Sequence, residues 1–497
     1  MAKGGTPEER FRALKATYFE VAHEATGWVG RKCDVVKKLS FVDLPEARAL
    51  MLRIVRRDRS HDVKFAGVAA LGRTADLRTI HEAVSYLTKS GDPVLIIAFG
   101  DGLAASKRDD VRKWVATTAL LKGKPPVLAA YLMAAGRLGH ADAVPAVVKL
   151  YEDNAARAGA VDIVCRAVDA LGEIGSADGM PTLVAASKHD DWRVRRSAAA
   201  ALPRAGLTDE RGRAAIRALF SDSSSTVKQT LAAACGAAKA TEFTLPLVGL
   251  LEDAPRLRTR YVAFQALKRI SGQDFGLDGN RWRRWIKEKD AGVPSTKRRT
   301  FAKYYGFSVY SDRVVFIVDI SGSMLRPSWK SPSRIDVAKN QLVQVLNGLD
   351  PKTLFNILVF STKTKTWQPR EIEATPANVK KAIAWALKKM DKPDGNTHTY
   401  DALERAFTKN PAFDTIYLLS DGNPSDGRYW KPDGVLASVR HWNRHRNATV
   451  HTIALTLWHT MLGRPPRNEK PLEMAGFMKR LATSTGGSSK HVQTPPN

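Results

Sequence analysis

The sequence predicts a multidomain protein: an N-terminal α-solenoid of helical repeats, followed by an α/β domain with a doubly wound, mostly parallel sheet. Residues 11–290 carry apolar residues at helical spacing, and similar segments return after 36 residues, which is typical of stacked helix pairs. After residue 300, apolar runs rich in β-formers alternate with amphipathic segments, as in a parallel sheet covered by helices. We therefore expect an N-terminal tail at 1–10, the solenoid at 11–290, a linker at 291–302 and the α/β domain at 303–497.

The length and the composition agree with more than one folded domain. A chain of 497 residues is too long for one ordinary core. Its content of 44% hydrophobic and 26% charged residues is that of a globular protein. The first residues lack the apolar core of a signal peptide, and no apolar run of about 18 residues follows. We therefore expect a cytoplasmic protein without a transmembrane segment.

The net charge of +28 comes from 78 basic and 50 acidic residues. After residue 300 there are 28 basic and 16 acidic residues, so the second part carries +12 and the first part the remaining +16. A positive field of this kind favours polyanions, first nucleic acid, then acidic protein surfaces or anionic membranes. Positive charge also serves solubility, and charge alone does not choose between these roles.

One segment of the helical part, Asp191 to Leu202, carries a resemblance to a known repeat. It reads Asp-x-x-Val-Arg-x-x-Ala-x-x-Ala-Leu, and Val194, Ala198 and Leu202 fall on one face of a helix. This sequence pattern resembles HEAT repeats of the short bacterial kind. The resemblance implies roughly seven or eight stacked helix pairs, whose curved surface usually binds a partner.

The second helix of each pair should begin at a turn that contains aspartate and proline. Proline is tolerated in the first turn of a helix, and an aspartate before it can accept hydrogen bonds from the first N–H groups. Two copies of this turn lie 36 residues apart, Asp142 with Pro145 and Asp178 with Pro181. We therefore expect Asp142 and Asp178 to cap the helices that follow them.

Two groups of basic side chains are candidates for binding a polyanion such as RNA. In the solenoid they are Arg195 and Arg196, with Arg204, Arg211 and Arg213. In the linker they are Lys297, Arg298 and Arg299. The solenoid arginines could line a basic inner groove, or they could be solvated and paired with acids of neighbouring repeats. The linker group could touch a phosphate backbone, or it could belong to a solvated connector.

The α/β domain shows strands and helices in alternation. We expect strands at 313–319, 353–360, 415–419 and 449–455, with a last edge strand at 488–493. We expect helices at 334–349, 376–390, 435–446 and 472–484, and a short helix after Thr399. Alternation of this kind predicts a doubly wound sheet, which binds ligands at the carboxyl ends of its strands.

The first of these strands ends in three oxygen-bearing side chains. Val314–Val318 is an apolar run expected to be buried on both faces of the sheet. Asp319, Ser321 and Ser323 follow at alternate positions, and Gly322 allows a tight turn. One carboxylate and two hydroxyls are suited to a hard cation such as Mg²⁺, although such a string alone is often only a turn or a helix cap.

Two later segments extend this set of oxygen donors. Thr397 precedes a helical pattern, and Asp421 closes the apolar strand at 415–419. The order Asp-x-Ser-x-Ser, then Thr, then Asp resembles the metal-ion-dependent adhesion site of von Willebrand factor type A domains. The resemblance covers about the last 195 residues. It implies that the ligands of a divalent ion, Mg²⁺ or else Mn²⁺ or Ca²⁺, are Asp319, Ser321, Ser323, Thr397 and Asp421.

Two residues next to the proposed ligands differ from the residues that are usual in the family's motif. Asn396 stands where a second glycine is common, and His398 stands where asparagine is common. Neither position is a ligand position, so the departures concern the shape of the loop. His398 could act as a general base or could only hold the loop by hydrogen bonds.

The leading hypothesis is a metal-dependent scaffold protein. In the resembled family an Asp or Glu of the partner protein completes the coordination of the ion, and the solenoid would give a second binding surface. The alternative is an RNA-binding protein similar in layout to Ro-type proteins, which join a helical-repeat ring to a type A domain. A hydrolase or phosphotransferase is a second alternative that lacks a nucleophile or a phosphate-binding loop, so we predict that the protein is not an enzyme.

Overall fold

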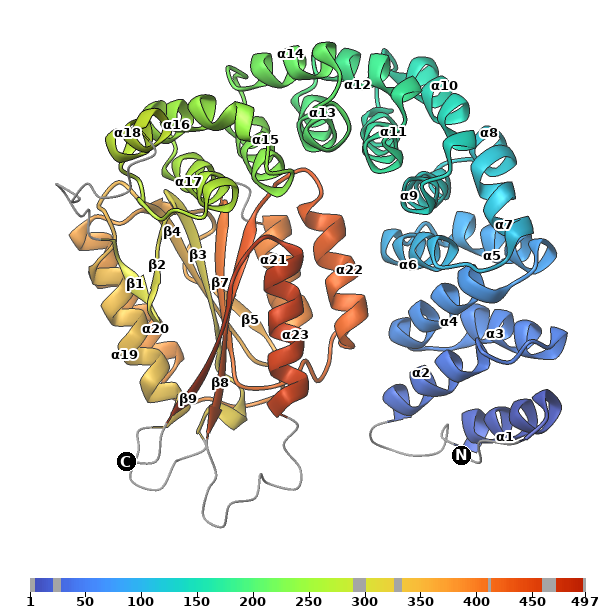
Figure 1. Cartoon of the computed structure of the whole chain (residues 1–497). Coiled ribbons are helices and arrows are strands. Elements are labelled where there is room, and N and C mark those ends of the chain that lie inside the picture. The colour runs from blue at the N-terminus through green and yellow to red at the C-terminus, as the bar shows by residue number, and fades with distance from the viewer. Residues whose placement is uncertain are drawn as a thin grey trace. The chain divides into compact units, whose positions relative to one another are not determined.

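The computed structural model describes residues 5–20, 28–288, 301–325, 333–409, 413–457 and 471–494. Its contacts divide the chain into two compact units (Figure 1). The helical unit comprises Met1–Ala254 and Val262–Gly292, and the sheet unit comprises Pro255–Tyr261 and Val293–Asn497. Most of the expected linker, residues 291–300, lies outside the described residues. None of the helices in the described ranges is long and apolar enough to cross a bilayer.

The helical part consists of a series of α-helices, and the π-helical stretch Val115–Ala119 joins α7 to α8. The first nine are α1 (Pro7–Glu20), α2 (Trp28–Leu39), α3 (Pro45–Arg57), α4 (His61–Thr74), α5 (Leu77–Ser90), α6 (Pro93–Ala104), α7 (Asp109–Trp114), α8 (Leu120–Lys122) and α9 (Leu128–Leu138). The others are α10 (Val144–Asn154), α11 (Val161–Ile174), α12 (Met180–Ala186), α13 (Trp192–Ala205), α14 (Glu210–Leu219), α15 (Ser225–Ala237), α16 (Thr244–Asp253), α17 (Leu257–Ser271) and α18 (Gly279–Glu288).

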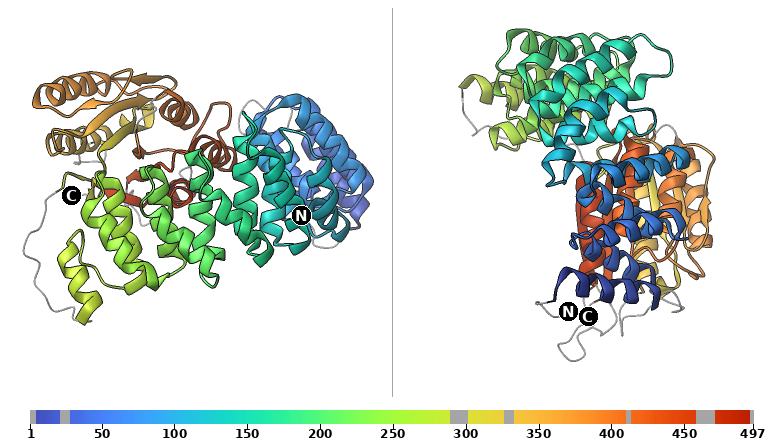
Figure 2. Two further views of the ribbon diagram at one scale, coloured as in Figure 1. Left: turned by 90° about the horizontal axis from the view of Figure 1, so that it is seen from above. Right: turned by 90° about the vertical axis from the view of Figure 1, so that its right-hand side faces the viewer.

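The helices of this unit are stacked in two layers, so the predicted α-solenoid is confirmed. In one layer α4 packs on α6, α6 on α9, α9 on α11, α11 on α13 and α13 on α15 (Figure 1, Figure 2). Small residues set the spacing of this layer. A Cβ atom on Gly172 would lie 2.3 Å from the Cβ of Ala201, so α11 and α13 meet almost backbone to backbone.

The expected caps at Asp142 and Asp178 are wrong, whereas an aspartate that was not expected to cap a helix does so. Asp191 accepts a hydrogen bond from the backbone N–H of Arg193 at the start of α13. Asp142 and Asp178 instead lie inside short 3₁₀ turns, Ala141–Ala143 and Ala177–Gly179, and do not cap the helices that follow. These turns already lead the backbone into α10 and α12, and the prolines occupy the first turns as expected.

The sheet unit contains a sheet in the order β5-β4-β3-β7-β8-β9, with β6 also paired to β4. Its strands are β3 (Arg313–Asp319), β4 (Leu354–Phe360), β5 (Thr364–Thr366), β6 (Ile372–Glu373), β7 (Thr415–Ser420), β8 (Thr449–Leu457) and β9 (Ser489–Thr494). The main path from β4 to β9 is parallel, and only β5 and β6 are antiparallel. A separate hairpin, β1 (Lys303–Tyr304) with β2 (Phe307–Ser308), was not expected.

Helices cover both faces of this sheet, as the predicted doubly wound fold requires (Figure 1). On one side lie α19 (Arg334–Asn347) and α20 (Pro376–Lys389); on the other lie α21 (Thr399–Lys409), α22 (Pro432–Asn443) and α23 (Pro471–Ser484). Val314, Phe316 and Val318 of β3 join the core on the side of α19 and α20. Val315 and Ile317 are also fully buried, so β3 is covered on both faces.

The register of the central strands places the expected metal ligands at one edge. β3 and β7 are parallel, and Val318 pairs with Leu419. Asp319 is therefore level with Ser420, directly before Asp421. Both strands end at this edge, which is where parallel sheets of this type bind ligands.

Candidate metal centre

Three loops meet at the carboxyl ends of β3 and β7. The loop after β3 is joined to the loop before α21 by backbone hydrogen bonds from Gly322 to Gly395 and from Asp394 to Ile320, both 3.1 Å. The loop before α21 is joined to the loop after β7 by a third bond, from the N–H of Ser425 to the carbonyl of Thr397, also 3.1 Å. The structure therefore brings the three predicted segments together.

Asp319 is fully buried at the centre of this site. Its Oδ1 accepts the backbone N–H of Ser321 at 2.8 Å, and its Oδ2 accepts the hydroxyl of Ser420 at 2.5 Å. These two bonds hold the carboxylate between the loop after β3 and the end of β7. Burial, and then the nearby charge of Asp421, raise the pKa of Asp319 to about 7.

Asp421 is bonded to two of its neighbours at once. Its Oδ1 accepts the hydroxyl of Ser323 at 2.7 Å, and its Oδ2 accepts Nη1 of Arg334 at 2.6 Å. The hydroxyl of Ser321 lies 3.1 Å from that of Ser323, which continues the chain of oxygens towards Asp319.

Thr397 lies beside Gly422, the residue after Asp421. A Cβ atom on Gly422 would lie 3.3 Å from Oγ1 of Thr397, so the glycine leaves room for the hydroxyl. The backbone N–H of Thr397 donates to the hydroxyl of Ser425 at 3.0 Å, and this bond fixes the position of the loop. All five predicted residues thus lie at the same edge of the sheet.

The donor set has the chemistry that a hard divalent cation prefers. It offers two carboxylates and three neutral hydroxyls, all of them oxygen donors. Two buried carboxylates close together repel each other, and a cation between them would relieve this repulsion. Within the described ranges no group of three or more His, Cys, Asp or Glu side chains could hold a metal ion.

Arg334 is a member of this site that the sequence interpretation missed. Its side chain is 3% exposed, and that of its partner Asp421 is fully buried. Arg334 is the first residue of α19, a position where the helix dipole disfavours positive charge. A basic residue at the start of an otherwise regular helix was therefore a signal for a nearby anionic partner.

His398 and Asn396 hold the loop that carries Thr397. His398 Nδ1 lies 3.2 Å from Asp401, and its Nε2 lies 3.5 Å from Asp426. The backbone N–H of Asn396 donates to the hydroxyl of Thr362 at 3.0 Å. These contacts favour a role for His398 in holding the loop over the alternative of a general base.

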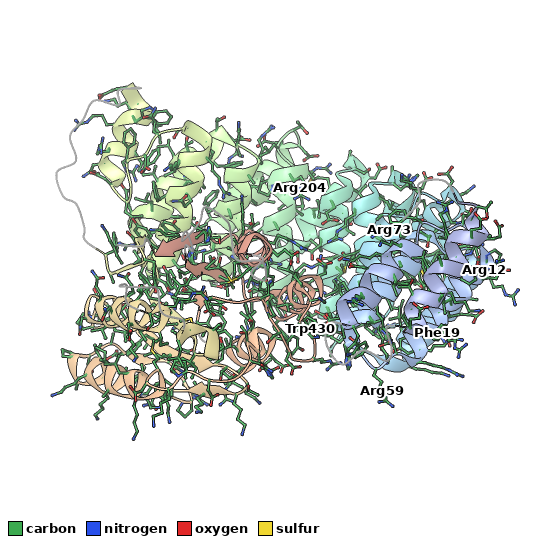
Figure 3. The ribbon with its side chains drawn as sticks, turned by 90° about the horizontal axis from the view of Figure 1, so that it is seen from below. Arg12, Phe19, Arg59, Arg73, Arg204 and Trp430 are labelled. Carbon is green, nitrogen blue, oxygen red and sulfur yellow. The ribbon has the colours of Figure 1, made fainter. Side chains whose placement is uncertain are left out.

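The expected basic groove of the solenoid divides into paired and hollow-lining arginines. Arg195 forms an ion pair with Asp222 at 2.6 Å and also donates to two backbone carbonyls. Arg211 and Arg213 pair with Asp209 and Glu210. Arg196 and Arg204 line a hollow of about 270 Å³, together with Arg166 and with Arg137, which pairs with Asp101. Arg204 is labelled in Figure 3. Lys297, Arg298 and Arg299 lie outside the described residues.

Two protein families match different parts of this chain. Residues 312–463 match the family model of the von Willebrand factor type A domain, and residues 160–212 match HEAT repeats. The chain is 28% identical over 200 residues to inter-alpha-trypsin inhibitor heavy chain H4 of Homo sapiens, with 37% of this chain and 20% of the relative covered. It is 30% identical over 128 residues to inter alpha-trypsin inhibitor, heavy chain 4, of Mus musculus, with 24% and 13% covered.

The chain therefore spans about a fifth or less of the length of these relatives. Among solved structures, an aerotolerance-related membrane protein from Bacteroides fragilis superposes with a TM-score of 0.27 at 18% identity, covering 36% of this chain and 90% of that chain. The family models, the parallel sheet and the stacked helices lead to one conclusion. The chain combines HEAT repeats with a von Willebrand factor type A domain.

Proposed function

We propose that this protein is a scaffold that binds another protein through a divalent ion, Mg²⁺ or a similar cation. The ion would be held by Asp319, Ser321, Ser323, Thr397 and Asp421. The observation that supports this proposal most is the convergence of these five side chains, from three separate loops, at one edge of the sheet. The helical repeats would provide a second binding surface.

The charges of the site favour an anionic partner. Asp319 and Asp421 contribute two negative charges when ionised, and Arg334 contributes one positive charge. A divalent ion would give the site a net charge of +1, and it would supply a Lewis-acidic position for an oxygen ligand. The three hydroxyls add no negative charge. An Asp or Glu carboxylate on the partner would then both fill the position and neutralise the site.

Side chains and backbone groups of the protein would hold the two carboxylates of this site in position before a partner binds. The bonds from Ser420 and from the N–H of Ser321 orient Asp319. Arg334 and Ser323 orient Asp421. Because the loops are fixed to each other through backbone bonds, little ordering of the chain is needed when a partner binds.

The test compares the wild type with Asp319→Ala in metal binding and in partner capture. Mn²⁺ binding is measured by electron paramagnetic resonance, and captured proteins are compared in Mg²⁺ and in EDTA. We expect Asp319→Ala to lose Mn²⁺ binding and the chelator-sensitive partners while its circular dichroism is unchanged. The control is Asp433→Ala, which removes an exposed carboxylate of α22 and should behave as the wild type. If the same proteins were captured in EDTA and by Asp319→Ala as by the wild type in Mg²⁺, the proposal would be contradicted.

A further inference from the structure

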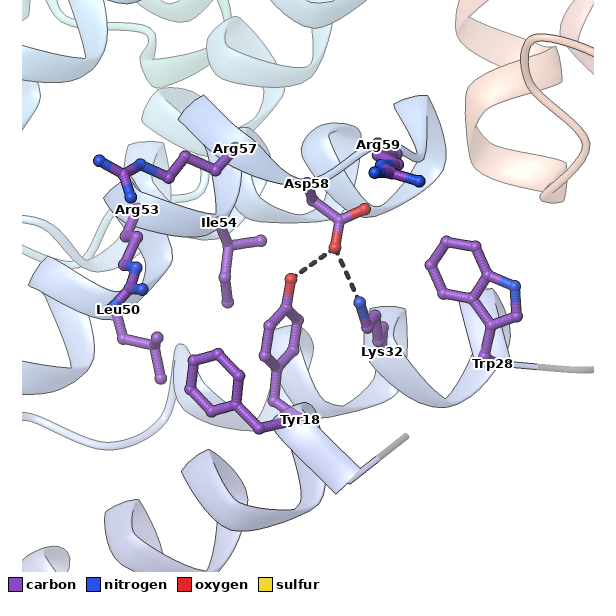
Figure 4. A pocket seen from close by; sticks show the side chains of 10 residues that line it. Tyr18, Trp28, Lys32, Leu50, Arg53, Ile54, Arg57, Asp58 and Arg59 are labelled. Carbon is purple, nitrogen blue, oxygen red and sulfur yellow. Dashed lines mark hydrogen bonds and ion pairs between the residues drawn. The ribbon is translucent and has the colours of Figure 1, made fainter. Parts of the chain in front are cut away.

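A hollow lies between α1, α2 and α3, at the N-terminal end of the helical unit. It has a volume of about 490 Å³, within the usual range of ligand pockets. Its walls combine aromatic and aliphatic side chains with several arginines (Figure 4). Its lining includes Tyr18, Phe19, Trp28, Lys32, Asp58 and the arginines at 53, 57 and 59.

The floor of this hollow is polar, buried and internally neutral. The buried carboxylate of Asp58 accepts hydrogen bonds from the hydroxyl of Tyr18 and from Nζ of Lys32, the latter at 3.1 Å. Its second oxygen accepts the backbone N–H of Ser60 at 2.8 Å. Lys32 and Asp58 therefore cancel each other, and this network joins α1 and α2 to the turn before α4.

The arginines around this floor carry positive charge that is not neutralised. Among the described residues, Arg53, Arg57 and Arg59 form no ion pair, and all three side chains are exposed. In Figure 4, Arg53 and Arg57 lie on one side of Asp58, whereas Arg59 and Trp28 lie on the other. The hollow thus has positive charge at both ends and a neutral centre.

Aromatic rings accompany the charge. Phe19 is 41% exposed, and the guanidinium of Arg53 stands 5.9 Å from the centre of its ring. Nζ of Lys32 lies 4.8 Å from the ring centre of Trp28, which holds the indole in place. An exposed ring beside free guanidinium groups suits a ligand that has a flat, stackable body and an anionic group.

We propose that this hollow binds a nucleoside phosphate, with the phosphate on the arginines and the base against Phe19. Three arginines match a phosphate, which offers oxygens in several directions, better than they match a single carboxylate. A second hollow, of about 730 Å³, shares Arg53 and Arg57 with the first and also contains Arg78. The acids of the second hollow, Asp76 and Glu82, pair with Arg48 and Arg56. The positive charge of the two shared arginines therefore continues to Arg78 on α5, which favours a single strand of nucleic acid as the source of the nucleotide, over a free nucleotide.

The test measures binding of a fluorescein-labelled 12-nucleotide oligouridylate to the full chain by fluorescence anisotropy. The triple variant Arg53→Gln, Arg57→Gln, Arg59→Gln should weaken binding at least about tenfold and reduce the slope of log K against log[salt] by about 2. The matched control, Arg211→Gln, Arg213→Gln, Arg217→Gln, removes the same charge from α14, where the arginines are paired with acids. It should change the affinity by less than about threefold.

Phe19→Ala tests the stacking separately from the charge. It should weaken binding by about fivefold or more and leave the salt slope unchanged. Displacement of the oligonucleotide by uridine monophosphate would assign the site to free nucleotides, whereas resistance to it would assign the site to strands. Equal losses in the two triple variants, no effect of Phe19→Ala, or equally tight binding of an oligoglutamate peptide would each overturn the proposal. EDTA should have no effect, which keeps this test independent of the metal centre.

Discussion

Asp421 receives two donors of different kinds, the neutral hydroxyl of Ser323 and the cationic guanidinium of Arg334. In the proposed site a divalent ion would draw on the same carboxylate. Arg334 therefore has two effects that oppose each other: it stabilises the pair of carboxylates when no ion is bound, and it lowers their affinity for a second cation. Both effects follow from its burial, because buried charges interact more strongly than exposed ones.

Arg334→Met should separate these two effects. We expect the variant to lose about 3 to 5 kcal/mol of stability without metal, because a buried carboxylate loses its partner. We also expect it to bind Mn²⁺ at least about tenfold more tightly than the wild type, because a competing positive charge is removed. Melting temperatures at increasing Mg²⁺ and Mn²⁺ paramagnetic resonance measure the two quantities.

The control for this variant is Arg480→Met, which removes an arginine on α23 that pairs with Asp433 at the surface. It should alter stability by less than about 1 kcal/mol and leave Mn²⁺ affinity unchanged. If Arg334→Met remained folded but bound Mn²⁺ more weakly than the wild type, Arg334 would be needed to build the site and would not compete with the ion.

His451 on β8 gives the sheet unit a dependence on pH. It stacks on Tyr417, with ring centres 5.0 Å apart, and its Nδ1 accepts the backbone N–H of Ser488 at 3.2 Å. Burial, and then the charge of Arg258, lower the pKa of His451 from 6.5 to about 3. The unfolded chain therefore takes up a proton below about pH 6.5 that the folded chain does not accept until about pH 3, so the stability due to neutral His451 is lost as the pH falls.

We expect the free energy of unfolding to drop by about 2 kcal/mol between pH 7 and pH 5 through this residue. His451→Gln, which keeps a hydrogen-bond acceptor and does not titrate, should lack this part of the pH dependence. Hydrogen exchange of the β8 amides, corrected for the intrinsic effect of pH, measures the difference. Identical pH profiles for the two proteins would show that the folded chain accepts the proton on His451 without cost.

At the scale of elements, the solenoid depends on close contacts between neighbouring helices. Gly172→Ala would place a methyl group 2.3 Å from the Cβ of Ala201, between α11 and α13. We expect it to destabilise the helical unit by about 1 to 3 kcal/mol, as overpacking does. Gly249→Ala is the matched control, because Gly249 lies in α16 and its new methyl group would meet no atom within 4 Å.

The control should raise stability by up to about 1 kcal/mol, since alanine favours a helix more than glycine does. Urea denaturation followed by circular dichroism at 222 nm measures both variants. A gain in stability from Gly172→Ala as large as that from Gly249→Ala would mean that α11 and α13 can move apart freely.

The long elements and the loops of the site could be predicted because each has a pattern of its own. β3 is an apolar run closed by Asp319, and its bounds are those expected. The hairpin of β1 and β2 and the antiparallel β5 and β6 are two or three residues long, too short to show a period. Arg334 was missed because its partner, Asp421, is 87 residues away in the sequence.

At the scale of the whole molecule, both parts of the sequence are basic, and the total charge is +28. A field of this size accelerates association with acidic partners and is screened by salt. For a partner captured through the proposed metal site, we expect the association rate to fall at least about tenfold between about 50 and 500 mM salt. EDTA should act mainly on the dissociation rate. Surface plasmon resonance measures the two rates separately. An association rate that does not change with salt concentration would exclude steering by this charge.

The most direct test of the proposed site is a crystal grown or soaked with Mn²⁺ and measured for anomalous scattering. We expect one strong anomalous peak within about 2.0 to 2.6 Å of oxygens from Ser321, Ser323 and Asp421, with Asp319 and Thr397 close by. No peak among these five side chains, at an Mn²⁺ concentration that saturates binding in solution, would contradict it.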